Sequence, residues 1–507
     1  MSCSSRDQPG AVKIDARKDG CKTTLSLSGT DAAHDHARHT DARRAHWSNL
    51  AGEVERFGAN RYYHRRLRDI YAAHVPSGQR VLELGCGTGD LLACVQPSHG
   101  VGIDFSPAMV AEARARHPQL VFQIADAHDL STLEGQFDVV ILSDLLNDLW
   151  DVEAVLSQVA RVSHAGTRVV LNNYSRLWEA PLSAAAYLGL ARPRLPQNWL
   201  TVEDVANLLY LSGFEVIKQW PEVIWPIAAP VVADVANRYV GKLWPFRLLA
   251  LTNVIVARPR PREPVPPEAL RVSVIVPARN EAGNIEQIFT RTPEMGAGTE
   301  LVFIEGHSKD DTYQIIEQAI ARYPERRAQL ARQEGVGKGD AVRLGFRIAQ
   351  GDVLMILDAD LTVPPEDLPR FFDVLRKGDA EFANGVRLVY PMEKQAMRFF
   401  NLLGNKFFSL AFSWMLGQPI KDTLCGTKVL TKANYERIAG SRHYFGDFDP
   451  FGDFDLLFGA ARLSLKIVDV PIRYRERTYG TTNIERWRHG WLLIRMVVFA
   501  ARRLKFV

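Results

Sequence analysis

The sequence lacks any uninterrupted apolar run of about 20 residues, the length a helix needs to cross a bilayer. Its five cysteines are scattered, without zinc-site spacing or an even disulfide set, which fits a reducing cytoplasmic compartment. Charges nearly balance, with 62 Lys and Arg against 58 Asp and Glu, so no dedicated nucleic-acid partner is expected. The polar N-terminus has no signal-peptide core, and residues 1–45 are expected to form a disordered tail.

The 507 residues exceed what one hydrophobic core usually supports, so two domains are expected. Five prolines among charges mark an extended linker at 258–270. Short β-rich runs alternate with helical stretches on both sides of this linker, which indicates the α/β class with two doubly wound parallel sheets. The expected domains are therefore 46–257 and 271–490, followed by a basic amphipathic helix at 491–507.

Three glycines, Gly85, Gly87 and Gly89, follow an apolar strand expected at Val81–Leu84. Glycines here let the backbone turn tightly and approach a ligand closely. The G-x-G-x-G spacing differs from the G-x-G-x-x-G of dinucleotide folds. Asp90 follows the loop, where a carboxylate repels pyrophosphate but suits a sulfonium cation.

Two more carboxylates follow the next expected strands. Asp104 ends a strand close to 20 residues beyond the loop and can accept hydrogen bonds from both ribose hydroxyls. Asp126 follows a third strand and is placed to meet an adenine amino group. The set predicts a nucleoside ligand without phosphate.

These motifs resemble the class I S-adenosylmethionine-dependent methyltransferases over about residues 48–257. The resemblance implies a Rossmann-like domain with S-adenosyl-L-methionine as its cofactor. It implies that Glu83 and the glycine loop border the methionine part, and that Ser143 and Asp144 face the methyl group. No residue identifies the methyl acceptor. Residues 177–198 and 220–246, rich in Pro and Trp, form either an acceptor lid or ordinary packing.

The second half places polar residues at four successive points near strand ends. An Asp-x-Asp pair at a strand end can share a divalent cation, Mg²⁺ or Mn²⁺, that bridges a diphosphate and offsets charge on the leaving nucleotide. A lysine in a glycine turn can reach phosphate oxygens, and a strand-end glutamate can accept from a uracil or guanine N–H. The residues are Pro277, Asn280 and Glu281, then Glu305, then Lys338, and then Asp358 and Asp360.

This set resembles the inverting family-two glycosyltransferases, most closely dolichyl-phosphate mannose synthase and related polyprenyl-phosphate glycosyltransferases, over about residues 270–490. The resemblance implies a GT-A-type fold, a UDP- or GDP-linked sugar donor and a polyprenyl phosphate acceptor. A phosphate acceptor needs arginines to position it and no strong base. The residues that match the subgroup are Arg387, Arg398, Asp422, Asp453 and Arg477.

Three positions depart from the subgroup's pattern. Glu305-Gly306 replaces Asp-Asp. Thr362 stands where the synthases have a metal-binding Gln, which indicates a weaker metal site. Asn483 stands where a Lys is expected near the acceptor phosphate.

Two apolar segments, Phe399–Leu416 and Trp491–Phe506, fit either a membrane surface or a protein core. If Arg398 holds a lipid phosphate, the helix behind it lies at the bilayer. The protein is then peripheral at the cytoplasmic face of the membrane.

Two alternatives remain open. The sugar could pass directly to a glycan, protein or natural product, with Asp422 or Asp453 as the base. One domain could instead be catalytically silent and serve as a binding or regulatory module.

Overall fold

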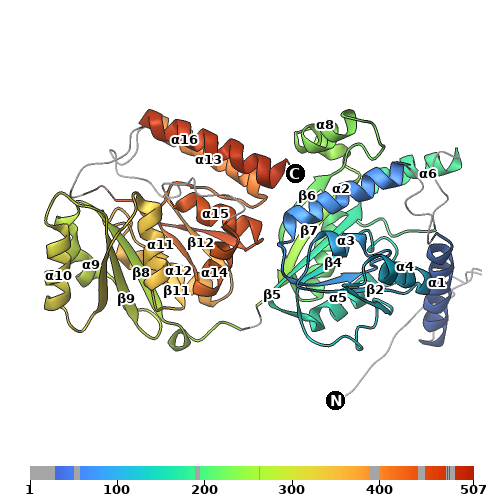
Figure 1. The fold of residues 1–507 in the computed structure, drawn as a ribbon, viewed down its shortest axis with the longest axis horizontal. Helices are drawn as coiled ribbons and strands as arrows, with labels where there is room; N and C mark the ends of the chain where they lie inside the picture. The colour runs from blue at the N-terminus through green and yellow to red at the C-terminus, as the bar shows by residue number, and fades with distance from the viewer. Residues whose placement is uncertain are drawn as a thin grey trace, which may run out of the picture.

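A computed structural model gives the structure of residues 29–50, 58–188, 195–261, 263–387, 399–442, 452–475, 477, 479 and 486–506. Each half of the chain builds its own seven-stranded sheet with helices packed on its faces, and the two lie side by side (Figure 1). Both halves are α/β, as the alternation of strands and helices predicted.

The first sheet has the order β3-β2-β1-β4-β5-β7-β6, in which β3 to β5 run parallel and β7 is antiparallel to both its neighbours. Strands β6 and β7 thus form an antiparallel pair at one edge of this sheet. Its strands are β1 (Arg80–Leu84), β2 (His99–Asp104), β3 (Val121–Ile124), β4 (Phe137–Leu142), β5 (Ser163–Tyr174), β6 (Phe214–Glu222) and β7 (Thr252–Pro259).

The helices of this half cover both faces of the sheet and extend past its upper edge in Figure 1. They are α1 (Gly29–Leu50), α2 (Gly58–His74), α3 (Asp90–Cys94), α4 (Pro107–Arg116), α5 (Val152–Arg161), α6 (Glu179–Tyr187), α7 (Val202–Leu211) and α8 (Val232–Arg238), with the 3-10 turns η1 (Arg176–Trp178), η2 (Val240–Lys242) and η3 (Phe246–Leu249).

The second sheet has the order β10-β9-β8-β11-β13-β12-β14. Strands β10 to β11 run parallel, but β13 is antiparallel to both β11 and β12. One antiparallel strand, β13, thus interrupts the parallel sheet that was expected here. Its strands are β8 (Val272–Ala278), β9 (Thr299–Glu305), β10 (Arg327–Arg332), β11 (Val353–Ile356), β12 (Phe382–Val386), β13 (Lys428–Thr431) and β14 (Ile467–Pro471).

The helices of this half include two long ones, α13 and α16, that lie against each other along the upper edge in Figure 1. The set is α9 (Ile285–Arg291), α10 (Thr312–Arg322), α11 (Lys338–Ile348), α12 (Leu368–Arg376), α13 (Phe399–Leu416), α14 (Lys432–Gly440), α15 (Asp453–Arg462) and α16 (Arg486–Ala500), with the 3-10 turns η4 (Pro267–Ala269), η5 (Ala282–Asn284) and η6 (Pro365–Asp367) and a π-helical turn at Ala501–Lys505.

Helices α13 and α16 each have a buried face and an exposed face. Phe412 and Met496 are fully buried in the second domain's core, whereas Phe407, Leu410 and Trp491 are exposed. The buried side chains confirm the protein-core interpretation for one face of each segment, and the membrane-surface interpretation stays a prediction. No helix in the described ranges is long and apolar enough to span a membrane.

Two expected boundaries need correction. Residues 29–45, assigned to a disordered tail, lie in α1, which hydrogen-bonds to the domain from Arg44 Nε to the Phe105 carbonyl (3.2 Å) and between the hydroxyls of Ser48 and Ser106 (2.9 Å). Residues 1–28 of that tail lie outside the described part. The expected linker starts inside β7, where Arg258 is buried and paired with Glu215.

Candidate functional site

The glycine loop follows β1 at the point where the sheet order reverses between β1 and β4, a usual position for ligand sites in such folds. All three glycines have positive φ, of 68°, 49° and 77° for Gly85, Gly87 and Gly89. A Cβ on Gly85 would press on Leu145 and one on Gly89 on Phe122, but one on Gly87 would meet nothing within 4 Å. Gly87 therefore leaves open space for a ligand, while the other two serve close packing.

Asp104 is held at the end of β2 by two backbone donors. The Gly87 amide donates to Oδ2 (3.0 Å) and the Ser106 amide to Oδ1 (2.8 Å). Burial raises the pKa of Asp104 despite these hydrogen bonds. Each carboxylate oxygen retains acceptor capacity, as ribose hydroxyls require.

Asp126 lies on the next loop and is oriented by His128. The His128 amide donates to Asp126 Oδ1 (2.9 Å), and the ring Nδ1 lies 2.6 Å from the same oxygen. Burial alone would raise the pKa of Asp126, but the His128 hydrogen bonds outweigh it and lower the pKa. Asp126 thus stays an anionic acceptor at neutral pH.

One cavity joins these residues. It is lined by Gly85, Ile103, Asp104, Phe105, Asp126, His128, Leu145 and Trp150, and by His39, Thr40 and Arg43 of α1. Of these lining residues, Gly85, Asp104 and Asp126 were predicted from the sequence, and the α1 side chains were not. The signal that could have indicated a functional segment is the group of histidines in residues 34–46. The overall polar composition of the N-terminus masked it.

Within the described ranges, one trio of His, Cys, Asp or Glu side chains is close enough to hold a metal: His36, Asp126 and His128, with ligand atoms within 4.8 Å of one another. It shares Asp126 with the cavity above. Asp126 is expected to accept a hydrogen bond from an adenine amino group. We therefore assign this trio to the proposed nucleoside pocket and not to a metal site.

Glu83 offers a direct test of fit for S-adenosylmethionine. Its side chain is buried, and Oε2 has no hydrogen-bond partner. Burial, followed by the nearby Asp104 and Asp90, raises the pKa of Glu83 well above its ordinary range. A buried acceptor without a donor fits the ammonium of a methionine moiety, so the residues present suit the cofactor.

Ser143 and Asp144 directly follow β4, the strand next to β1. Asp144 has a positive φ of 53° and is fixed by the Tyr63 hydroxyl (2.9 Å) and the Asn172 amide (2.5 Å). Burial raises the pKa of Tyr63, so it remains a donor. The pair is thus rigidly placed at the expected edge of the sheet.

The Asp-x-Asp pair follows β11 in the second domain, and each carboxylate has a cationic partner. Lys338 Nζ lies 2.6 Å from Asp358 Oδ1, and Arg477 Nη2 lies 2.6 Å from Asp360 Oδ2. Thr362 donates from its backbone and hydroxyl to Asp360 Oδ1. The carboxylates that a metal would use are therefore already charge-balanced by groups suited to phosphate.

Glu281 joins this cluster from the loop after β8. Its Oε1 lies 3.4 Å from Arg477 Nη1, and its Oε2 accepts from Asn284. Burial raises the pKa of Glu281 to about 7, against the opposing effect of Arg477. Three predicted residues, Glu281, Asp360 and Arg477, thus form one contiguous group.

The other predicted donor-side residues lie on the neighbouring strand ends. Asn280 has a positive φ of 57° and accepts from the Lys309 amide (2.7 Å), while Glu305 accepts from the Ser308 amide (2.5 Å). Pro277 pairs with Ile304 in the parallel ladder. These hydrogen bonds fix the loops at the strand ends.

Gly426, four residues after Asp422, is a contact point of the site. A Cβ there would collide with Asp358 Oδ2 and Lys338 Nζ. The chain thus closes over the Lys338–Asp358 pair at a distance that only glycine permits.

Asp422 is fully buried and saturated with donors. Arg387 donates from its backbone amide (3.1 Å) and Nε (2.7 Å) to Oδ2, and from Nη2 (2.9 Å) to Oδ1, which also accepts from the Leu424 amide (3.0 Å). Four donors fill the roughly four acceptor positions of a carboxylate. Asp422 raises the pKa of Arg387, against the effect of burial, so the arginine stays charged.

The remaining predicted residues lie outside what can be described. Arg398 and Asn483 fall outside the described residues. Asp453 begins α15, and its side chain lies outside the described part of the chain. Its neighbour Gly452 packs against Gly339, which places the start of α15 beside the Lys338 turn.

Comparison with known proteins gives a separate family match in each half of the chain. Residues 58–219 match a family model described as a methyltransferase domain, and residues 273–431 match the model for glycosyl transferase family 2. Demethylmenaquinone methyltransferase from Beutenbergia cavernae is 33% identical over 218 residues, which cover 42% of this chain and 85% of that protein. The chain belongs to the S-adenosylmethionine-dependent methyltransferases through its N-terminal domain.

The second domain is similar to glycosyl transferase family 2 over residues 273–431. Dolichol-phosphate mannosyltransferase from Pyrococcus furiosus is 28% identical over 223 residues, 43% of this chain and 60% of that protein. Undecaprenyl-phosphate 4-deoxy-4-formamido-L-arabinose transferase from Shewanella sediminis is 32% identical over 111 residues, 21% of this chain and 34% of that protein. The chain thus spans less than two thirds of both glycosyltransferase relatives.

Proposed function

We propose that the second domain transfers a sugar from a UDP- or GDP-linked donor to a polyprenyl phosphate, with inversion. The observation that carries this is the saturation of Asp422, one of the two candidate bases for a hydroxyl acceptor. Its acceptor positions are filled by Arg387 and Leu424, so it has no lone pair left for an acceptor proton. A phosphate acceptor, already anionic at neutral pH, needs no base.

The proposed mechanism uses the chain's own cations. Lys338 and Arg477 leave Asp358 and Asp360 as the donor diphosphate arrives and hold its oxygens by charge-assisted hydrogen bonds. Arg387 Nη1 has no hydrogen bond to the residues that the structure describes, and it can position the acceptor oxygen. A Mg²⁺ or Mn²⁺ ion held by Asp358 and Asp360 would supply charge neutralisation on the leaving nucleotide.

We propose that the first domain binds S-adenosyl-L-methionine and transfers its methyl group to an acceptor that remains unidentified. Glu83 would face the ammonium, Asp104 the ribose and Asp126 the adenine. The cofactor supplies an activated methyl group, and the rigid Asp144 with its neighbour Ser143 orients the acceptor by proximity.

We also propose that the protein binds membranes through an apolar face shared by both domains. In Figure 1, α6, α8, α13 and α16 lie along one edge of the molecule. Large apolar side chains on or beside them are exposed, including Trp244 (74%) and Trp491 (65%). The exposed Arg247, Arg495 and Arg503 on the same elements suit anionic lipid headgroups.

The test of the glycosyl transfer uses full-length protein, a panel of UDP- and GDP-sugars with Mg²⁺ or Mn²⁺, and matched polyprenyl phosphate and polyprenol. Nucleoside diphosphate release and the mass of the extracted lipid are measured. We expect one hexose added to the phosphate and none to the alcohol. Asp360→Asn should abolish transfer, while Asp373→Asn, at an exposed ion pair on α12, should not. Transfer to the alcohol at an equal rate would refute the proposal.

The membrane proposal is tested by sedimentation with vesicles that contain or lack anionic lipid. Trp244→Glu and Trp491→Glu should each reduce binding, and Val121→Glu, at an exposed position on β3, should not. Equal sedimentation of all four proteins would contradict a specific binding face.

A further inference from the structure

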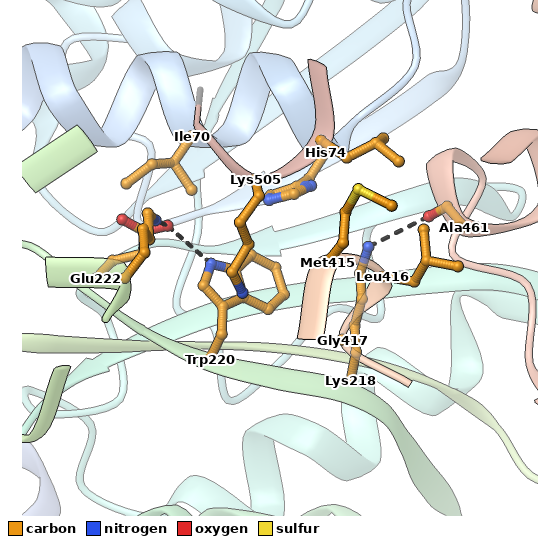
Figure 2. A pocket seen from close by; sticks show the side chains of 12 residues that line it. Ile70, His74, Lys218, Trp220, Glu222, Met415, Leu416, Gly417, Ala461 and Lys505 are labelled. Carbon is orange, nitrogen blue, oxygen red and sulfur yellow. Dashed lines mark hydrogen bonds and ion pairs between the residues drawn. The ribbon is translucent and has the colours of Figure 1, made fainter. Parts of the chain in front are cut away.

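A cavity lies between the two domains, away from both sites described above (Figure 2). His74 of α2, Lys218 and Glu222 of β6, and Lys242 of η2 line it from the first domain. Lys505, in the π-helical turn, lines it from the second. The free space is about 30 Å³, and one water needs about 10–15 Å³. The cavity thus has room for a few water molecules or the oxygens of a small ion.

Positive charge is in excess around this cavity. Glu222, its one acidic lining residue, is bound by Lys242 and by Trp220 Nε1 (2.9 Å) and lies 3.7 Å from Arg66. Lys218 instead points at the Ala461 carbonyl (3.3 Å), and Lys505 lies over the Trp414 ring (5.3 Å). Within the described part of the chain, neither lysine has an ion pair with a carboxylate.

Burial makes this imbalance costly, because an unpaired buried ammonium loses its hydration without an opposite charge in return. Burial and the neighbouring cations lower the pKa of Lys218 to about 7 and that of Lys505 to about 8. Both lysines are therefore close to losing their protons at neutral pH. An anion in the cavity would restore their charge and occupy their unused N–H donors.

We propose that this interdomain cavity is a binding site for a small phosphate-class oxyanion, held by Lys218 from one domain and Lys505 from the other. Ammonium groups are well suited to phosphate oxygens. The small space admits a phosphate group but no nucleotide base. Because the two lysines belong to different domains, a bound anion ties the methyltransferase and glycosyltransferase halves together. This site is separate from both sites of the proposed function.

Calorimetric titration of full-length protein with sodium phosphate, against sodium chloride at equal ionic strength, tests the site. We expect saturable binding of phosphate that chloride does not reproduce. Lys218→Gln should weaken it about tenfold or more, the usual effect of losing a charged hydrogen bond. Lys505→Gln, near the chain's C-terminus, should do the same and serves if the first variant fails to fold.

Lys466→Gln is the matched control, since Lys466 also lies between the domains but is paired with Glu215 (2.5 Å). It should bind phosphate as the wild type does. No saturable phosphate heat, or equal affinity in the wild type and both cavity variants, would overturn the proposal.

A second titration distinguishes free phosphate from a lipid headgroup as the natural ligand. It compares inorganic phosphate with soluble short-chain phosphatidic acid. Binding of either one that is lost in Lys218→Gln supports the site, and preference for the lipid indicates a headgroup. Neither ligand binding would overturn it.

A pH series with sulfate, a dianion throughout, should show affinity falling from pH 6 to 9 as Lys218 and Lys505 lose protons. Affinity that stays constant over this range would count against the two lysines as the binding groups. The other charged or titratable groups facing them are His74, Arg66, Arg168, Glu222, Lys242, Arg247 and Arg462.

Discussion

Replacing Glu381 by Gln should loosen the two domains from each other. Glu381 lies in the second domain and accepts from Arg168 Nη2 of the first at 2.7 Å, with Arg258 Nη1 at 3.3 Å. Both arginine side chains are at most 5% exposed, so the variant leaves two buried cations short of an opposite charge. Breaking a buried ion pair costs about 3–5 kcal/mol.

The lower end of that range applies here, because each arginine retains other partners. Arg168 keeps the carbonyls of Ser464 (2.9 Å) and Gly166 (3.0 Å), and Arg258 keeps Glu215. About 3 kcal/mol corresponds to a roughly 150-fold weaker interface. A protease site inserted between Glu263 and Pro264 allows the folded chain to be cut and the dissociation constant of the two halves measured.

The matched control is Glu366→Gln, which breaks an equally short arginine pair, to Arg291 (2.8 Å), at a half-exposed position. Exposed pairs contribute about 0–1 kcal/mol, so this variant should leave the dissociation constant unchanged. Glu381→Gln combined with Arg168→Met should recover much of the loss, since no unpaired charge remains at 168. A change below about tenfold in Glu381→Gln would refute the reasoning.

Four further outcomes follow from the same structure. Gly426→Ala should displace the Lys338–Asp358 pair and reduce glycosyl transfer with S-adenosylmethionine binding unchanged, whereas Gly440→Ala, where a Cβ meets nothing within 4 Å, should be neutral in the same assay. Asp104→Asn should weaken S-adenosylmethionine binding about 10- to 100-fold by calorimetry, and the exposed Asp129→Asn should not. Burial, then Arg43, lowers the pKa of His39 from 6.5 to about 4. Between about pH 4 and 6.5, His39 binds a proton in the unfolded state but not in the folded state. Docking of α1 should therefore weaken as the pH falls from about 6.5 to 4, which hydrogen exchange would measure. The variant His39→Asn should remove this pH dependence. Glu381, a carboxylic acid, also has a lowered pKa in the folded state. Burial would raise its pKa, but Arg168 and Arg258 outweigh this and lower it. Its contribution is therefore present above about pH 4.3 and is lost as pH falls through the lowered folded value, so the cut halves should separate more readily only in acid.

Local motifs were predictable because their chemistry and geometry lie within a few residues. The glycine loop, the strand-end carboxylates at 104 and 126, and the Asp-x-Asp pair each need a strand followed by a turn, and periodicity reveals that arrangement. Helix α1 was not predicted from the sequence, because its low hydropathy and many charges resemble those of a solvated tail. It docks through hydrogen bonds and the histidine and arginine side chains at the cavity, which a hydrophobic pattern does not report.

The direction of β13 has a physical reason that the sequence did not reveal. Arg387 follows β12 and Asp358 follows β11, so both lie at the carboxyl edge of the sheet. The contacts of Asp422 with Arg387 and of Gly426 with Asp358 bring the 422–426 turn to the same edge. A strand that starts there must run back, antiparallel to its neighbours. The turn is thus part of the site, and the antiparallel strand is its consequence.

The contacts between the domains could not be predicted from the sequence, and they bear on what a fusion of two transferases achieves. In the sequence, nothing distinguishes Arg168, Arg258 and Glu381 from ordinary surface charges. Glu381 lies more than 100 residues away from both arginines in the chain. Only the packed structure buries them and brings Lys218 and Lys505 to one cavity. Domains joined merely by a tether would keep such charges solvated. The buried network therefore indicates a fixed arrangement of the two sites, which the Glu381→Gln measurement tests directly.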